Sequence, residues 1–292
     1  MDFTSLGVPA PLAAALAARG ITEPTEIQRE VIPAACTGEN LIGEAPTGTG
    51  KTLAYLLPAL MRIDPAVRAA QVLVLAPTHE LAMQIVGAAR DLIQAAGLSV
   101  GVQALIGGAN VQRQIDALKK KPALIVGSAP RIVELHRLRK LKLQEVRLCV
   151  LDEFDRLLDK QHSAEVRAVL HLLPRERQML LLSATAAAAA VHAAEELCAL
   201  RIIRAAVQET TCENYYHIVP FRDKIKAVQK LTRRLPIRRG LVFVGRSFDA
   251  EKAAEKLQYE GIRVAALLGG ERRDQRRAAL NAIRTGRVQL LI

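Results

Sequence analysis

The sequence contains few aromatic residues: Phe, Trp and Tyr make up 3% of its 292 positions, and tryptophan is absent. This scarcity excludes the aromatic platforms on which single-stranded nucleic acids stack their bases. Half of the residues are hydrophobic, which is enough for a sizeable core. No apolar run reaches the ~20 residues that cross a bilayer. We therefore expect a globular protein without a membrane partner.

Cysteines and secretion signals are also scarce. The four cysteines lie far apart and lack the spacing of metal ligands, so we expect reduced thiols. The first residues, MDFTSLGVPAPL, carry no basic segment followed by an apolar core, which is the pattern of a secretory signal. These absences predict a cytoplasmic protein.

Positive charge is unevenly distributed along the chain. The net charge is +12, and residues 206–292 hold 18 Lys and Arg against 9 Asp and Glu. A basic surface of this kind fits a polyphosphate partner such as a nucleic acid. A solvated basic surface without any partner is the alternative, and charge alone does not choose between the two.

Short apolar runs alternate with stretches of helical pattern over the first two thirds of the chain. The alternation predicts an α/β fold with a parallel sheet covered by helices on both faces. We also expect a helix at the alanine-rich residues 186–190. The predicted strands are 40–44, 72–76, 100–106, 123–127, 148–151 and 179–182.

The pattern breaks after about Arg204 and then restarts. Residues 206–214 are predicted to be a linker between a first domain, 1–205, and a second domain, 215–292. Because the chain stops on an apolar strand with no covering helix, we expect the second domain to be incomplete. Its predicted strands are 215–219, 240–244, 263–267 and 288–292, and its predicted helices are 224–234, 248–259 and 272–284.

A glycine-rich loop between a predicted strand and a predicted helix is the strongest local motif. Its residues are Ala45, Pro46, Thr47, Gly48, Thr49, Gly50, Lys51 and Thr52. The glycines let backbone N–H groups turn toward phosphate oxygens. Lys51 is placed to reach the β- and γ-phosphates, and Thr52 offers a hydroxyl to Mg²⁺. The motif predicts ATP binding.

An acidic motif ends another apolar strand, at Asp152 and Glu153. Its carboxylates should project at the same sheet edge as the glycine-rich loop. Asp152 can hold Mg²⁺ through water, and Glu153 can orient or deprotonate the attacking water. An acidic helix start that interacts with the helix dipole is the alternative.

These motifs together resemble a DEAD-box RNA helicase of superfamily 2, over residues 3 to 292. Asp152–Asp155 stands where that family has Asp-Glu-Ala-Asp, with Phe154 at the third position, which packs rather than reacts. Ser183-Ala184-Thr185 matches the family's Ser-Ala-Thr motif, which couples the ATP state to domain closure. The resemblance implies two RecA-like domains. It also implies the catalytic residues Lys51, Asp152, Glu153, Ser183 and Thr185.

An upstream segment resembles the adenine-reading Q motif of the same family. It runs from Gly20 to Gln28, and Phe3 precedes it at the family's spacing. A glutamine amide can pair with an adenine edge, and a ring can stack on the base. The resemblance implies that Gln28 and Phe3 read adenine while Thr25 supports the loop. A helix N-cap at Thr25 and a core Phe3 are the alternatives.

The RNA contacts follow from the resemblance as well. The sequence departs from the family at His79 for Arg, Pro130 for Gly, Leu268 for His and Arg273 for Gln. Phosphate contacts carry no sequence information, so we expect low specificity. The RNA-binding candidates are Thr78, Gly107, Gly108, Arg131, Arg273 and Arg276.

The predicted function is an ATP- and Mg²⁺-dependent RNA helicase. Two later motifs of the family do not occur within the sequence, so we expect this chain to bind nucleotide and to be weakly active alone. An RNA-binding clamp without useful ATPase activity and a superfamily 2 DNA translocase are the alternatives. The pair Phe3 and Gln28 argues against the translocase.

Overall fold

The computed structural model describes residues 2–205, 213–245, 247–268 and 273–292. The chain divides into two compact units, Met1–Glu209 and Thr210–Ile292, and each is described by itself. Most of the predicted linker, residues 206–212, lies outside the described residues. Within the described part, no helix combines the length and the apolar character needed to cross a membrane.

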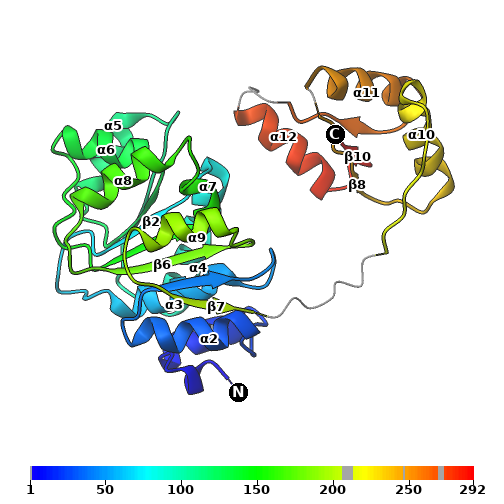
Figure 1. The fold of residues 1–292 in the computed structure, drawn as a ribbon. Coiled ribbons are helices and arrows are strands. Elements are labelled where there is room, and N and C mark those ends of the chain that lie inside the picture. Colours follow the sequence, from blue (N-terminus) through cyan, green and yellow to red (C-terminus); the bar gives the residue numbers. More distant parts are fainter. Residues whose placement is uncertain (1, 206–212, 246, 269–272) are drawn as a thin grey trace. The chain divides into compact units, whose positions relative to one another are not determined.

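A seven-stranded parallel sheet forms the centre of the first unit (Figure 1). Its strand order is β3-β4-β2-β5-β6-β1-β7, and six of the strands match the predicted ones. The seventh, β7, was not predicted, because its sequence RIIR has only two apolar residues between arginines; it pairs with β1 at the sheet edge. The strands are β1 (Leu41–Glu44), β2 (Val72–Leu75), β3 (Val102–Leu105), β4 (Leu124–Gly127), β5 (Leu148–Asp152), β6 (Gln178–Ser183) and β7 (Arg201–Arg204).

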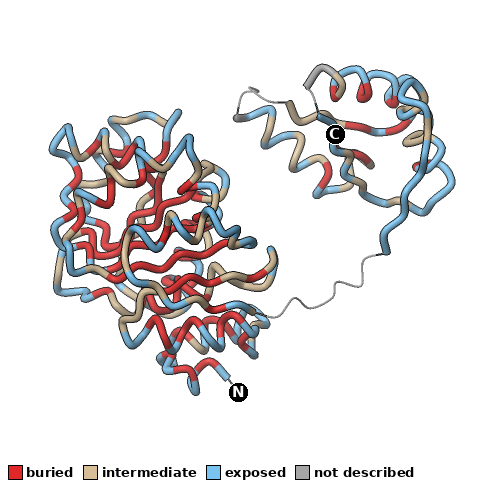
Figure 2. The backbone as a smooth tube through the Cα atoms, in the orientation of Figure 1, coloured by how far each residue is buried: buried red, intermediate tan, exposed pale blue. Residues whose placement is uncertain are grey.

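Helices cover both faces of this sheet, which confirms the predicted fold class. Alternate strand residues enter two separate cores: Val72 and Val74 pack into one, and Leu73 and Leu75 into the other. Figure 2 shows the resulting buried strands. The first core also takes residues from the 3₁₀ helix η1 (Thr4–Leu6) and from α1 (Ala10–Ala17), α2 (Glu26–Cys36), α3 (Lys51–Arg62) and α4 (His79–Ala95). The second takes residues from α5 (Val111–Leu118), α6 (Ala129–Arg137), α7 (Phe154–Leu157), α8 (Ser163–Leu172) and α9 (Ala188–Glu195).

The second unit has a small parallel sheet with the order β8-β10-β9. The helices α10 (Lys224–Arg234), α11 (Ser247–Tyr259) and α12 (Arg273–Arg284) follow the predicted ranges closely, and a 3₁₀ helix η2 spans Phe221–Asp223. Its strands are β8 (Gly240–Leu241), β9 (Val264–Ala265) and β10 (Leu290–Leu291), each shorter than predicted.

The strand predicted at 215–219 is wrong. These residues are described, and they adopt no regular secondary structure. The side chains of Tyr215, Tyr216 and Ile218 are exposed. A strand needs backbone hydrogen bonds from a neighbouring strand, and an apolar run alone does not supply them.

Candidate functional site

The polar residues singled out in the sequence gather at one edge of the large sheet. In a parallel sheet, the carboxyl ends of all strands lie at the same edge. The glycine-rich loop follows β1, Asp152 ends β5, and Ser183 ends β6. Because β5, β6 and β1 are consecutive in the sheet, the fold brings these segments together.

The glycine-rich loop leads directly into α3. Gly48 and Gly50 both have a φ of +88°, which glycine adopts without the steric cost of a side chain. A Cβ added to Gly48 would meet nothing within 4 Å, so the loop is open at this point. Gly50 is the N-cap of α3, and Lys51 is its first residue. The loop thus presents a helix N-terminus, an anion-binding element.

Lys51 is held inside this loop by backbone carbonyls. Its Nζ donates to the oxygen of Ala45 at 2.5 Å and to that of Pro46 at 2.9 Å. Burial lowers the pKa of Lys51, while the carboxylates of Asp152 and Glu153, among others, act in the opposite direction. The ammonium therefore lies between the loop and the acidic motif.

Asp152 lies almost fully buried, with 4% of its surface exposed. One carboxylate oxygen accepts a hydrogen bond from the Tyr55 hydroxyl at 2.7 Å, and the other accepts from the Glu153 N–H at 3.1 Å. Burial raises the pKa of Asp152, and the hydrogen bond from Tyr55 opposes this rise. The sequence analysis did not identify Tyr55, because this contact joins residues 97 positions apart.

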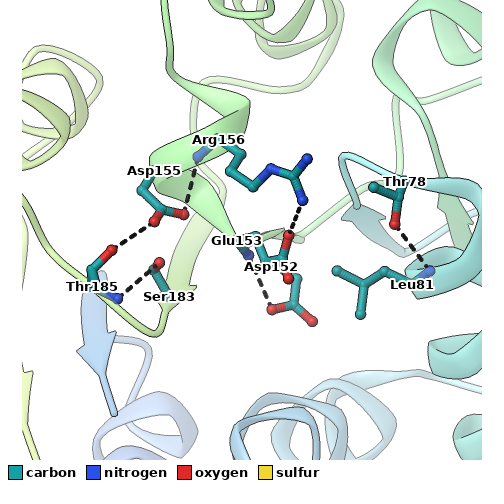
Figure 3. A network of polar contacts seen from close by, with 8 residues as sticks. All are labelled: Thr78, Leu81, Asp152, Glu153, Asp155, Arg156, Ser183 and Thr185. Carbon is teal, nitrogen blue, oxygen red and sulfur yellow. Dashed lines mark hydrogen bonds and ion pairs between the residues drawn. The ribbon is translucent and has the colours of Figure 1, made fainter. Parts of the chain in front are cut away.

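Glu153 adopts a left-handed backbone conformation with a φ of 54°. This region costs a non-glycine residue roughly 1–2 kcal/mol. Its carboxylate pairs with Arg156 at 3.1 Å and remains partly exposed, as Figure 3 shows. The next residue, Phe154, is fully buried in the second core, which agrees with the packing role expected at that position.

Ser183 and Thr185 connect the end of β6 to the acidic motif. Ser183 is buried, and its Oγ accepts from the Thr185 N–H at 3.3 Å. The Thr185 hydroxyl donates to Asp155 at 2.8 Å (Figure 3). These contacts place the Ser-Ala-Thr segment beside the residues predicted to act on ATP.

Glu44 lies at the same sheet edge, and the sequence analysis did not identify its contacts either. It ends β1, and its carboxylate accepts from the Ala186 N–H and from Nε of Arg204, both at 2.9 Å. It therefore connects the loop after β6 with the end of β7. Only the sheet order brings these three segments together, so no local sequence signal could have indicated the contact.

Gln28, one of the two residues predicted to read adenine, contacts the glycine-rich loop. Thr25 and Gln28 form a capping box at the start of α2. The Gln28 amide accepts from the Thr25 N–H and donates to the Gly50 oxygen, each at 3.0 Å. Phe3 is 2% exposed and belongs to the first core. Thr25 thus is a helix cap and Phe3 is a core residue; their roles toward adenine remain predictions.

The RNA-binding candidates differ in exposure. Thr78 caps α4 by accepting from the Leu81 N–H at 3.2 Å (Figure 3). Gly107 and Gly108 are exposed just after β3. Arg131 is only 7% exposed, and its Nε pairs with Glu134 at 3.0 Å. A phosphate contact by Arg131 thus requires its guanidinium to leave this buried position.

The two candidates in the second unit lie on α12. Arg276 is half-buried. The backbone of Arg273 begins the helix, and its side chain lies outside the described residues. Gly269, which follows Leu268 in the family motif, also lies outside them. No described group of three or more His, Cys, Asp or Glu residues forms a metal cluster.

Comparison with known proteins identifies the family. The DEAD/DEAH box helicase model matches residues 25–193. The chain is 39% identical to the DEAD-box ATP-dependent RNA helicase CshC of Bacillus cereus, over 94% of this chain and 70% of that protein. It is 37% identical to the probable ATP-dependent RNA helicase YfmL of Bacillus subtilis, over 94% of this chain and 73% of that protein.

Solved structures agree with this result. Saccharomyces cerevisiae Dbp5 bound to RNA and ADP BeF3 matches with a TM-score of 0.84 and 26% identity. That match covers all of this chain and 75% of the Dbp5 chain. The chain therefore belongs to the DEAD/DEAH box helicase family.

Proposed function

We propose that this protein is an ATP-dependent RNA helicase whose first unit binds and hydrolyses ATP. One observation carries the proposal: Lys51 and the buried Asp152 lie at the same sheet edge, beside a loop with two glycines at positive φ. Relatives of the same family are named ATP-dependent RNA helicases.

ATP would bind with its phosphates over the start of α3. The loop and the start of α3 would offer backbone N–H groups to the phosphates, and Lys51 would exchange its contacts with Ala45 and Pro46 for phosphate oxygens. The adenine would lie near Gln28 and Phe3. Gln28 already hydrogen bonds to the backbone oxygen of Gly50. This bond connects the proposed base-binding residue to the proposed phosphate-binding loop. Each amide atom of Gln28 retains hydrogen-bonding capacity for the base.

The chemistry of the site fits Mg²⁺. Thr52 and Asp152 offer the oxygen ligands that Mg²⁺ prefers. Within the described residues, the two oxygens of the buried Asp152 carboxylate accept one hydrogen bond each. When bound, Mg²⁺ would neutralise developing phosphate charge. Glu153 would orient the attacking water and accept its proton. Ser183 and Thr185 would transmit the nucleotide state through Asp155.

RNA would bind mainly through its phosphates. The first-domain candidates are Thr78, Gly107, Gly108 and Arg131; the second domain, residues 215–292, would add Arg273 and Arg276 and most of the net positive charge. Residues 215–292 would be part of a second RecA-like domain, following the ATP-binding domain of residues 1–205. We place the protein in the cytoplasm.

The test separates nucleotide binding from hydrolysis. Lys51→Ala should weaken ATP binding, whereas Glu153→Gln should retain binding and lose RNA-stimulated hydrolysis. Glu165→Gln, at an exposed carboxylate on α8, is the matched control and should behave as wild type. Hydrolysis by Glu153→Gln at the wild-type rate would contradict the role given to Glu153.

The same assay distinguishes the alternatives. ATP hydrolysis stimulated by single-stranded RNA and not by single-stranded DNA supports the helicase. Stimulation by DNA alone would indicate a DNA translocase. In a longer chain that also carries the family's two later motifs, RNA binding without any RNA-stimulated hydrolysis would indicate a clamp.

A further inference from the structure

We infer that Tyr55 is a positioning residue of the ATP site, whose hydroxyl orients the Asp152 carboxylate toward the nucleotide-bound metal ion. The inference rests on the proposed function, because it assumes that Asp152 acts toward Mg²⁺. It adds a residue outside the motifs described above.

The fold places the Tyr55 hydroxyl where such a role requires it. Tyr55 follows Lys51 by one turn of α3, so the two side chains lie on the same side of the helix. The residue is fully buried between α3 and the sheet. Its hydroxyl is 2.7 Å from Oδ2 of Asp152. Because Oδ1 accepts from the Glu153 N–H, each carboxylate oxygen has one fixed donor.

Burial raises the pKa of Tyr55 well above its ordinary value, and the negative charge of Asp152 adds to the rise. The phenol is therefore the neutral partner in this contact, and its hydroxyl donates to the carboxylate.

The hydroxyl is not needed to fill the core. A phenylalanine ring would occupy the same buried volume, so packing alone does not explain a polar atom at this place. A buried hydroxyl without a partner is unfavourable, and here its partner is the buried carboxylate. Groups that hydrogen bond to metal ligands fix the orientation of those ligands, and their loss typically costs metal affinity about 10- to 100-fold.

The experiment measures the affinity of a fluorescent ADP for the 292-residue chain, once with excess Mg²⁺ and once with EDTA. For Tyr55→Phe, we expect the Mg²⁺-dependent gain in affinity to fall about tenfold relative to wild type, with unchanged affinity in EDTA. Tyr216→Phe removes a hydroxyl from a side chain that is 90% exposed and should match wild type in both conditions.

A second measurement tests whether Tyr55 acts through Asp152. In an Asp152→Asn background, Tyr55→Phe should have little further effect on the Mg²⁺-dependent gain. An equal loss of affinity in Mg²⁺ and in EDTA, or a full effect of Tyr55→Phe in the Asp152→Asn background, would overturn the inference. A Tyr55→Phe variant with the same Mg²⁺-dependent gain in affinity as wild type would also overturn the inference. If wild type itself shows no Mg²⁺ response, the proposed metal site fails instead, and Tyr55 has no ligand to position.

Discussion

Gly50 is predicted to be less replaceable than Gly48, although both lie in the same loop with the same φ of +88°. Replacing either by alanine forces a Cβ into the left-handed region, at roughly 1–2 kcal/mol. The two sites differ in their surroundings. A Cβ on Gly48 would meet nothing within 4 Å, whereas a Cβ on Gly50 would lie 2.3 Å from Nε2 of Gln28.

The additional cost at Gly50 follows from this collision. The Gln28 amide must move, and it then loses its bonds to the Gly50 oxygen and to the Thr25 N–H, each now 3.0 Å long. Leaving buried polar groups unsatisfied costs about 1–3 kcal/mol. Gly50→Ala should therefore destabilise the nucleotide-free protein by about 1–3 kcal/mol more than Gly48→Ala.

Calorimetric melting of both variants checks this prediction. Each kcal/mol corresponds to about 2–4 °C for a unit of this size, so the transition of the first unit should be several degrees lower for Gly50→Ala than for Gly48→Ala. In a Gln28→Ala background the two replacements should cost the same, because the colliding amide is gone. Equal melting temperatures for the two single variants would refute the reasoning.

Two further predictions concern the base and the buried acid. Gln28 should select adenine over guanine, so ADP should bind more tightly than GDP. Gln28→Ala should lose about 1–3 kcal/mol of this discrimination. Equal affinities of the wild type for ADP and GDP would contradict the adenine role. Asp152→Asn should raise the melting temperature of the nucleotide-free protein near pH 7, because burial raises the pKa of Asp152 above 3.8. Because the pKa of Asp152 is raised in the folded protein, wild type loses stability as the pH rises through that pKa. The gain in melting temperature from Asp152→Asn should therefore shrink as the pH falls toward 3.8. An unchanged gain down to that pH would contradict this account.

The glycine-rich loop, the acidic motif and the Ser-Ala-Thr segment could be predicted from the sequence because each is a local pattern. Phosphate binding requires consecutive backbone groups, so its signal lies in consecutive residues such as Gly48–Lys51. The strands β1 to β6 and the three helices of the second unit were also predictable, since apolar runs and helical periodicity are local as well. The family, and with it the function, followed from these patterns.

The tertiary structure decided what depends on residues far apart in the sequence. The Tyr55 hydroxyl reaches Asp152, and Glu44 reaches both Ala186 and Arg204, only because the strand order places β5, β6, β1 and β7 side by side. The burial of Arg131 and the absence of a strand at 215–219 were likewise outside local patterns. Side-chain burial and strand pairing depend on what the rest of the chain supplies as neighbours, and no short window of sequence contains those neighbours.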